Sequence, residues 1–465
     1  MIRILAYISL LVLLCVGVAT AAILHSPVPV SDWISNPVAS FALTQGENPA
    51  PVKLDIPAPQ PLSAVAMLGK QIFYDTSLSA SGKISCVTCH SPDHSYGPPS
   101  DLPAVYGGPD VAAQGMRAVP SLMYLNHQPN FSIGPDPGGD DDTPVALPQA
   151  IAKARTKIRV TKTAQDTSQS AANFVPLGGL FWDGRANTLQ IQAMGPLFSP
   201  FEMDGGNIQR IAAKLQAAPY AATFTELFGP DIFNQQGLLI DEAMFAVVRY
   251  EIEDNSFHPY TSKYDSWLQG QARLSTAEMR GYVLFNDPTK GDCGACHLDQ
   301  PTPDGQPPIF TDHQFEALGA PRNSKLLANN NPNYYDLGIC GPYRSDLAGQ
   351  TQYCGMFLTP TLRNAATRTV FFHNGVYHNL QQVLDFYAFS VAQPQKIYPR
   401  GPDGQVLMFN DLPKKYWNNI DRTDPPFDRQ IGDTPVLNHA DEQDIIAFLK
   451  TLDDGYVPAG AKPNT

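Results

Sequence analysis

The sequence predicts a mainly α-helical protein made of two similar domains, joined by long irregular connections. Three observations lead to this fold class. Of the 465 residues, 43% are apolar and 16% are charged, so the chain can bury a core and is not disordered. The motif Cys-x-x-Cys-His occurs twice, at residues 86–90 and 293–297, and similar segments flank both copies. The 43 prolines indicate moderate helix content and long stretches without regular structure.

The chain is acidic, with 31 Lys and Arg residues against 44 Asp and Glu residues and a net charge of −13. This balance argues against nucleic acid, and against an anionic membrane surface, as the main partner. It permits docking to a basic protein.

The chain begins with an apolar segment. Residues 4–24 are uncharged and follow Arg3, and Ala19-Thr20-Ala21 provides a small-residue cleavage site. The segment is also about long enough to span a bilayer, so residues 1–24 are expected to be either a signal peptide or an N-terminal anchor. Both alternatives predict export to the periplasm, with or without attachment to the inner membrane. Residues 25–60 contain seven prolines and are expected to form a linker.

The Cys-x-x-Cys-His motif is typical of covalently attached haem. The two thiols add to the vinyl groups of one haem, and the adjacent histidine binds the iron. The alternative is a zinc or disulfide pair followed by an unrelated histidine, and it would need the same coincidence twice. We therefore expect two haem c groups. Cys86 and Cys89 would attach the first haem, with His90 as its iron ligand. Cys293 and Cys296 would attach the second haem, with His297 as its iron ligand.

Two further cysteines, Cys340 and Cys354, bracket a Gly- and Pro-containing stretch. In an oxidising compartment such a pair is expected to form a disulfide. Cys15 lies inside the N-terminal segment and is expected to be only one of its apolar residues.

The internal repeat extends beyond the haem motifs. A helical segment precedes each motif, at residues 68–75 and 281–287. Downstream of each motif comes an aromatic-x-(Asp/Asn)-Gly turn followed by a Leu-Gln helix, at residues 181–190 and 372–381. The repeat predicts two related cytochrome-c-like domains with one haem each.

These patterns give the domain boundaries. We expect an N-terminal haem domain over residues 61–255 and a C-terminal haem domain over residues 256–455. Residues 456–465 form a tail, and the Gly-, Pro- and Asp-rich residues 128–145 are expected to be a surface loop. Apolar spacing predicts a last helix over residues 444–452.

The repeat also predicts a difference between the haems. When Gly184 is aligned with Gly375, Pro196 falls on Tyr387. A phenol oxygen can bind ferric iron, whereas proline has no side-chain donor. The second haem would then be six-coordinate, with His297 and Tyr387, and the first haem would have a vacant face. From spacing alone, packing of Tyr387 is as good an explanation, and Met356 is an alternative ligand.

At this point the chain resembles the bacterial dihaem cytochrome c peroxidases. The resemblance covers most of residues 61–455 and keeps the order of the motifs, which are the two haem motifs, Phe181–Ala186, Gly195-Pro196, Phe201–Met203 and Thr359–Asn364. Within this family, a tyrosine at position 387 is similar to the MauG branch, named for an enzyme that completes a tryptophan-derived quinone cofactor in methylamine dehydrogenase. The ordinary peroxidases have a methionine there.

The resemblance implies that the N-terminal domain carries the peroxide-reactive haem and the C-terminal domain the electron-transfer haem. It also implies roles for several residues. Trp182 would relay electrons between the haems, and Gln192 and Glu202 would line the peroxide pocket. Glu202 would act as the general acid, because cleavage of the O–O bond needs a proton on the leaving oxygen. Without the resemblance, a buried aromatic and a solvated or capping acid would be the ordinary interpretations. Arg363, like His373, is expected to bind haem propionates rather than iron.

Two departures from the family pattern matter. Switching peroxidases carry a histidine that blocks the first haem until it is reduced, but residues 106–120 contain no histidine. The first haem is therefore expected to be open at rest. The family's calcium ligands are replaced here by Ala118, Arg368 and Val370, so calcium is doubtful, and Arg368 is expected to substitute for its charge.

Together these features predict a dihaem c-type peroxidase. It would use hydrogen peroxide to oxidise either a protein partner, as in MauG-like maturation, or a small electron-donor protein such as a cytochrome c. The alternative from another class is an electron-transfer dihaem cytochrome without peroxidase activity, which would need a second ligand on the first haem, from His94 or His127.

Overall fold

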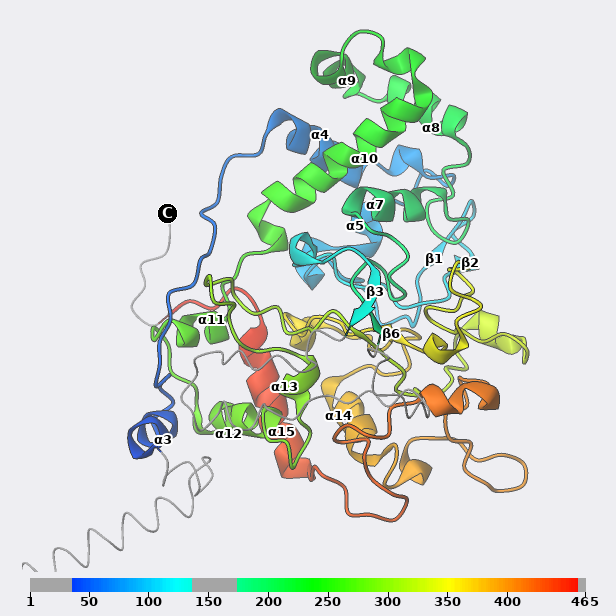
Figure 1. The fold of residues 1–465 in the computed structure, drawn as a ribbon. Helices are drawn as coiled ribbons and strands as arrows, with labels where there is room; N and C mark the ends of the chain where they lie inside the picture. Colours follow the sequence, from blue (N-terminus) through cyan, green and yellow to red (C-terminus); the bar gives the residue numbers. More distant parts are fainter. Residues whose placement is uncertain (1–35, 136–173, 459–465) are drawn as a thin grey trace, which may run out of the picture.

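The computed structural model describes residues 36–135 and 174–458. The expected signal or anchor segment at residues 1–24, part of the expected loop at 136–145 and the end of the tail at 459–465 lie outside the described residues. Over the described part the protein is mainly helical with a few short strands (Figure 1), which confirms the predicted fold class. None of the helices in this part is both long and apolar enough to cross a membrane.

The first half of the described chain is built around the helix pair α4 and α10. Its helices are α4 (Ala64–Tyr74), α5 (Cys86–Cys89), α7 (Leu189–Phe198), α8 (Ile208–Ala217), α9 (Ala221–Phe228) and α10 (Gln236–Glu253). Gly69 of α4 lies against the backbone of α10, because a Cβ atom there would lie 1.8 Å from the carbonyl oxygen of Ala246. The missing side chain is what lets the two helices approach so closely.

The second half repeats this arrangement with α12 and α15. Its helices are α11 (Lys263–Leu268), α12 (Thr276–Phe285), α13 (Cys293–Cys296), α14 (Leu380–Phe389) and α15 (His439–Leu449). Gly281 of α12 lies against α15, where a Cβ atom would be 1.9 Å from the carbonyl oxygen of Asp444. The predicted last helix is therefore present, although it begins earlier than residue 444.

In the described part of the chain, three two-stranded antiparallel ladders add to the helices. They pair β1 (Tyr106–Gly107) with β2 (Ala113–Gln114), β3 (Ser132–Pro135) with β4 (Phe174–Leu177), and β5 (Phe315–Glu316) with β6 (Phe357–Leu358). The segment expected to be a loop over residues 128–145 thus contributes a strand. Leu177 also bridges to Gln314, which joins the two halves.

Two apolar cores correspond to the two halves. One contains buried residues from Leu68 to Tyr260, and most of the other lies between Tyr264 and Leu452. The cores separate between Tyr260 and Tyr264, a few residues after the expected boundary between residues 255 and 256. The boundary itself stays a prediction.

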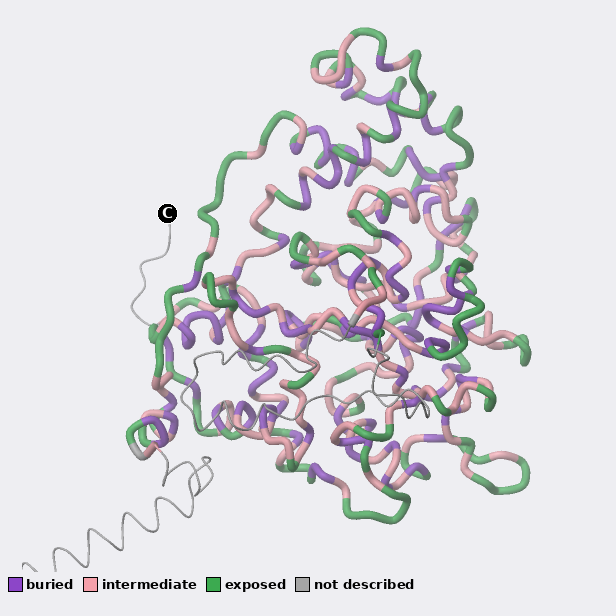
Figure 2. The backbone as a smooth tube through the Cα atoms, in the orientation of Figure 1, coloured by how far each residue is buried: buried purple, intermediate pink, exposed green. Residues whose placement is uncertain are grey.

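The expected linker crosses the second half before it enters the first. Its helix α3 (Pro37–Thr44) leads into an extended stretch that is mostly exposed and runs up to α4 (Figures 1 and 2). Leu43 and Leu54 are buried in the core of the second half, and the indole of Trp267 donates a hydrogen bond to the carbonyl of Gly46 over 3.0 Å. The segment acts as a strap over the second half.

Candidate haem sites

Both haem motifs form a single helical turn that ends at its histidine. His90 follows α5 and His297 follows α13. In each ring Nδ1 donates a hydrogen bond to a backbone carbonyl, that of Tyr96 at 3.0 Å and that of Phe310 at 2.9 Å. A protonated Nδ1 puts the ring's lone pair on Nε2, the orientation that iron-binding histidines adopt. The donor set therefore fits a haem at each motif.

The second motif faces a cavity of about 310 Å³. Its lining is mostly apolar and includes Cys293, Cys296 and His297. Trp182 and Gln192 from the first half also line it, so the cavity extends to the junction of the halves. An apolar cavity next to two thiols and a correctly oriented imidazole is the setting that covalent haem needs.

Tyr387 lies in this cavity, together with the second motif. It belongs to α14, and it interacts electrostatically with Cys293 and Cys296. Burial is the main reason why the pKa of Tyr387 is raised. Met356, the alternative ligand, is not among the lining residues of this cavity and instead packs with the cluster of Phe315.

The counterpart of Tyr387 in the first half is Pro196, and the structure supports that alignment. Thr188 caps α7 and Asn379 caps α14, and each accepts a hydrogen bond from a backbone N–H three residues on. Pro196 and Tyr387 therefore occupy the same position of two equivalent helices. His94 and His127 are both exposed, so neither is placed to supply the second iron ligand that Pro196 cannot provide.

Trp182 is held at the junction of the halves by both its backbone and its ring. Its indole N–H donates to the carbonyl of Ala118 over 2.8 Å, and its own carbonyl accepts from the N–H of Leu358 over 2.9 Å. The position is suitable for the relay role expected of it, which stays a prediction.

Glu202 follows α7 and lies near the first haem motif. Burial raises the pKa of Glu202, and Arg185 and a hydrogen bond from Ser199 offset this only in part. Cys89 also interacts electrostatically with it. A carboxyl that holds its proton more tightly than usual is suited to act as an acid. Gln192, in contrast, is buried on α7 and lines the cavity of the second motif.

Arg363 and His373 both line the cavity, but both have protein partners. The guanidinium of Arg363 makes a two-point ion pair with Asp265 at 2.7 and 2.9 Å and donates to the carbonyl of Pro308. His373 stacks on Phe357 with ring centroids 3.6 Å apart, and burial lowers the pKa of His373 to about 4. The expected contact of both residues with haem propionates stays a prediction. The charge of Arg363 is already balanced by Asp265.

Arg368 is the cation of the cavity whose charge has no carboxylate partner among the described residues. Its Nη2 donates to the carbonyl of Val119 over 2.9 Å, and burial lowers the pKa of Arg368 to about 10. It also acts on His90 electrostatically. Among the described residues no cluster of His, Cys, Asp and Glu side chains is arranged to hold a metal ion, and the structure gives no evidence on calcium.

Sequence reasoning missed a buried charge cluster beside Glu202. Arg117 pairs with Asp183 at 2.8 Å and with Asp336 at 2.6 Å, and all three side chains are nearly inaccessible to solvent. Arg185 pairs with Asp183 as well, at 2.8 Å. Arg117 and Asp336 are 219 residues apart, so no local pattern could have linked them.

Two equivalent haem-binding turns, one of them beside an apolar cavity that also contains a tyrosine, indicate a dihaem c-type redox protein. Comparison with known proteins agrees. The family profile "Di-haem cytochrome c peroxidase" matches residues 63–273. The diheme peroxidase BthA from Burkholderia thailandensis is 30% identical, with a TM-score of 0.70, and the match covers 87% of this chain and 89% of that one.

Curated relatives support the same assignment. Methylamine utilization protein MauG of Paracoccus denitrificans is 27% identical, over 84% of this chain and 89% of its own length. Cytochrome c551 peroxidase of Nitrosomonas europaea is 26% identical, over 70% of this chain and 75% of its own length. The chain belongs to the di-haem cytochrome c peroxidase family and is an oxidoreductase that acts on peroxide. The predicted family and enzyme class are confirmed.

Proposed function

We propose that this protein uses hydrogen peroxide to oxidise a partner protein in the periplasm, in the manner of the MauG branch. The observation that carries the proposal is the placement of Tyr387 beside the second haem motif, while Pro196 occupies the same helix position at the first. Because the two sites differ at this position, they can have different roles: peroxide is reduced at the first haem, and oxidising equivalents are stored at the second.

The residues around the first motif have separate tasks in this reaction. Reduction of hydrogen peroxide to two waters consumes two electrons and two protons. When bound, the haems supply the iron and the electrons for this reduction. Glu202 delivers a proton to the departing oxygen, since burial lets it keep that proton at a higher pH than an exposed glutamate. Trp182 connects the two sites from its place at the junction of the halves.

The test is to mix the fully oxidised, haem-loaded protein with one equivalent of peroxide and follow the haem spectrum rapidly. We expect a fast change and a slow recovery without prior reduction. A protein that reacts only when half reduced would contradict an open first haem and favour a switching peroxidase. A protein that is silent in both redox states would favour the plain electron carrier.

A variant pair tests the acid. Glu202→Gln should slow the reaction with peroxide by about 10²–10⁴-fold, the range expected for loss of a general acid. Glu226→Gln, which removes an equally sized charge from an exposed position on α9, should leave the rate unchanged. Equal rates in all three proteins would contradict the role of Glu202.

A second candidate differs only in the reductant, which would be a small electron-donor protein. The similarity to a cytochrome c551 peroxidase favours it. Steady-state turnover with peroxide and a reduced small c-type cytochrome separates the two. Rapid turnover would support the electron-donor hypothesis, and slow turnover with long-lived oxidising equivalents would support oxidation of a partner protein.

A further inference from the structure

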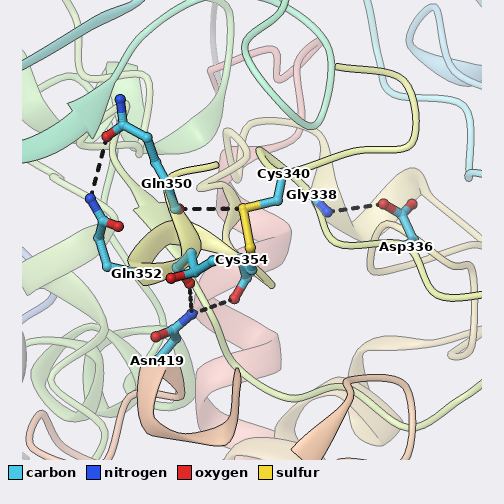
Figure 3. The surroundings of a disulfide bond; sticks show 8 residues. Asp336, Gly338, Cys340, Gln350, Gln352, Cys354 and Asn419 are labelled. Carbon is cyan, nitrogen blue, oxygen red and sulfur yellow. Dashed lines mark hydrogen bonds between the residues drawn. A yellow bond between two sulfur atoms is a disulfide. The ribbon is translucent and has the colours of Figure 1, made fainter. Parts of the chain in front are cut away.

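The loop between Cys340 and Cys354 belongs to the second half, but Tyr343, Arg344 and Tyr353 in it contact the first. The two cysteines form the expected disulfide, with Cα atoms 5.0 Å apart. Asn419 fixes the far end of the loop by donating to the carbonyls of Thr351 and Cys354 at 2.8 and 2.9 Å (Figure 3). The N–H of Gly338 donates to Asp336 at the near end over 3.0 Å. The loop is thus held at both ends and closed by a covalent bond.

Arg344 anchors this loop to the turn that carries Trp182. Its Nη1 donates to the carbonyl of Asp183 over 2.9 Å. Its guanidinium also lies 3.8 Å from the ring centroid of Phe131. Arg344 is buried, so these contacts fix the position of the residue before it.

That preceding residue, Tyr343, contacts two guanidinium groups through its ring. Arg117 lies 4.7 Å and Arg185 lies 5.0 Å from the centroid of its ring. Arg185 is also 3.6 Å from the ring centroid of Phe181, so two aromatic rings contact it. Contacts of this kind between a cation and a ring are attractive.

Arg185 is in turn the cation that acts on Glu202. The titratable groups that interact with Glu202 are Arg185 from the Trp182 turn, Tyr343 from the disulfide loop and Cys89 from α5. A chain of interactions therefore runs from the loop to Tyr343, from the Tyr343 ring to the guanidinium of Arg185, and from Arg185 to the proposed acid, where the interaction is electrostatic.

We propose that Tyr343 is a positioning residue of the peroxide pocket, and that its ring holds Arg185 in place and shields Glu202 from water. The inference rests on the proposed function of Glu202. Burial raises the pKa of the Tyr343 phenol to about 12, so the residue contributes a neutral ring and no charge. The ring, and not the hydroxyl, carries the contact with both guanidinium groups.

The expected effect has a defined sign. Burial is the largest cause of the raised pKa of Glu202 and outweighs the opposing effect of Arg185. Removing the Tyr343 ring admits water, so the pKa of Glu202 should fall towards its ordinary value. The acid would then lose its proton at a lower pH, and the rate of reaction with peroxide would decline earlier as the pH rises.

The experiment uses the full-length, haem-loaded protein and four variants: Tyr343→Ala, Tyr343→Phe, Glu202→Gln and Gln352→Ala. Gln352 is an exposed residue of the same loop that contacts Gln350 (Figure 3) and serves as the matched control. Two readouts are taken against pH, the rate of reaction with peroxide and the infrared band of the protonated Glu202 carboxyl. The band is assigned by its loss in Glu202→Gln.

We expect the inflection of both readouts to move to lower pH in Tyr343→Ala and to stay at the wild-type position in Tyr343→Phe and Gln352→Ala. An unmoved inflection in Tyr343→Ala would overturn the proposal, and so would an equal movement in Tyr343→Phe. If Glu202→Gln leaves the rate and its pH profile intact, the proposed function of Glu202 fails instead. A double Cys340→Ser/Cys354→Ser variant should shift the inflection in the same direction as Tyr343→Ala, because it releases the loop.

Discussion

The buried carboxyl of Glu251 links the stability of this protein to pH. Glu251 lies on α10 and is 6% exposed, and its Oε2 has no hydrogen-bond partner among the described residues. It interacts electrostatically with Cys86, at the first haem motif. Burial alone raises the pKa of Glu251 from 4.5 to about 8. Replacement by glutamine keeps the shape of the side chain and removes its titration.

The sign and size of the effect follow from this pKa. Folding favours the protonated carboxyl, so its stabilisation is complete below pH 4.5 and is lost as the pH rises through about 8. Each pH unit within this window lowers the free energy of unfolding by about 1.4 kcal/mol, which amounts to roughly 3 kcal/mol at pH 7. The amide introduced by Glu251→Gln does not titrate, so the variant has no such loss. The unpartnered polar atoms of this amide cost about 1–3 kcal/mol at every pH.

The assay is urea denaturation of the haem-loaded protein between pH 5 and pH 7.5, followed by far-ultraviolet circular dichroism. We expect the free energy of unfolding of Glu251→Gln, relative to wild type, to rise by about 1.4 kcal/mol per pH unit. Glu226→Gln, at an exposed position, should show no such slope. A constant difference between Glu251→Gln and wild type would mean that the carboxyl is ionised in the folded protein, and the reasoning would be refuted.

Three further predictions concern the charge cluster and the cavity. Arg117→Ala leaves the buried carboxylate of Asp336 without its ion-pair partner and Asp183 with Arg185 alone, so it should lower the free energy of unfolding by about 3–5 kcal/mol, measured by the same denaturation. Tyr387→Phe should change the visible spectrum of the oxidised second haem and Met356→Ala should not, whereas the reverse result would make Met356 the ligand. Arg368→Gln removes a cation that has no carboxylate partner among the described residues, so it should lower a haem midpoint potential in a redox titration. An unchanged potential would mean that Arg368 does not interact with the haem propionates.

The features that the sequence predicted are those in which chemistry depends on neighbouring residues. The two thiols of a haem motif and its histidine are within five residues of each other, so their spacing alone indicates the cofactor. The repeat could be aligned without a gap because Thr188 and Asn379 begin equivalent helices. That alignment correctly places Pro196 and Tyr387 at matching positions.

The features that the sequence missed depend on residues far apart in the chain. Asp265 neutralises Arg363 across 98 residues, and nothing near Arg363 indicates that it already has a partner. A buried arginine must be paired or lie against an anion, but only the fold shows which. For Arg363 the partner is a carboxylate of the protein, whereas Arg368 has only a backbone carbonyl.

Residues far apart in the chain also contribute to the proposed peroxide chemistry. The groups proposed to act in peroxide reduction, Trp182 as the relay and Glu202 as the acid, are both in the first half of the chain, and the family profile over residues 63–273 contains them. Their environment is made by Asp336 and Tyr343, which come from the second half. The proposed peroxide pocket therefore depends on residues from both halves. Changes in the disulfide loop should alter peroxide chemistry even though the loop carries none of the family's motifs, and the pH profile of Tyr343→Ala measures that dependence directly.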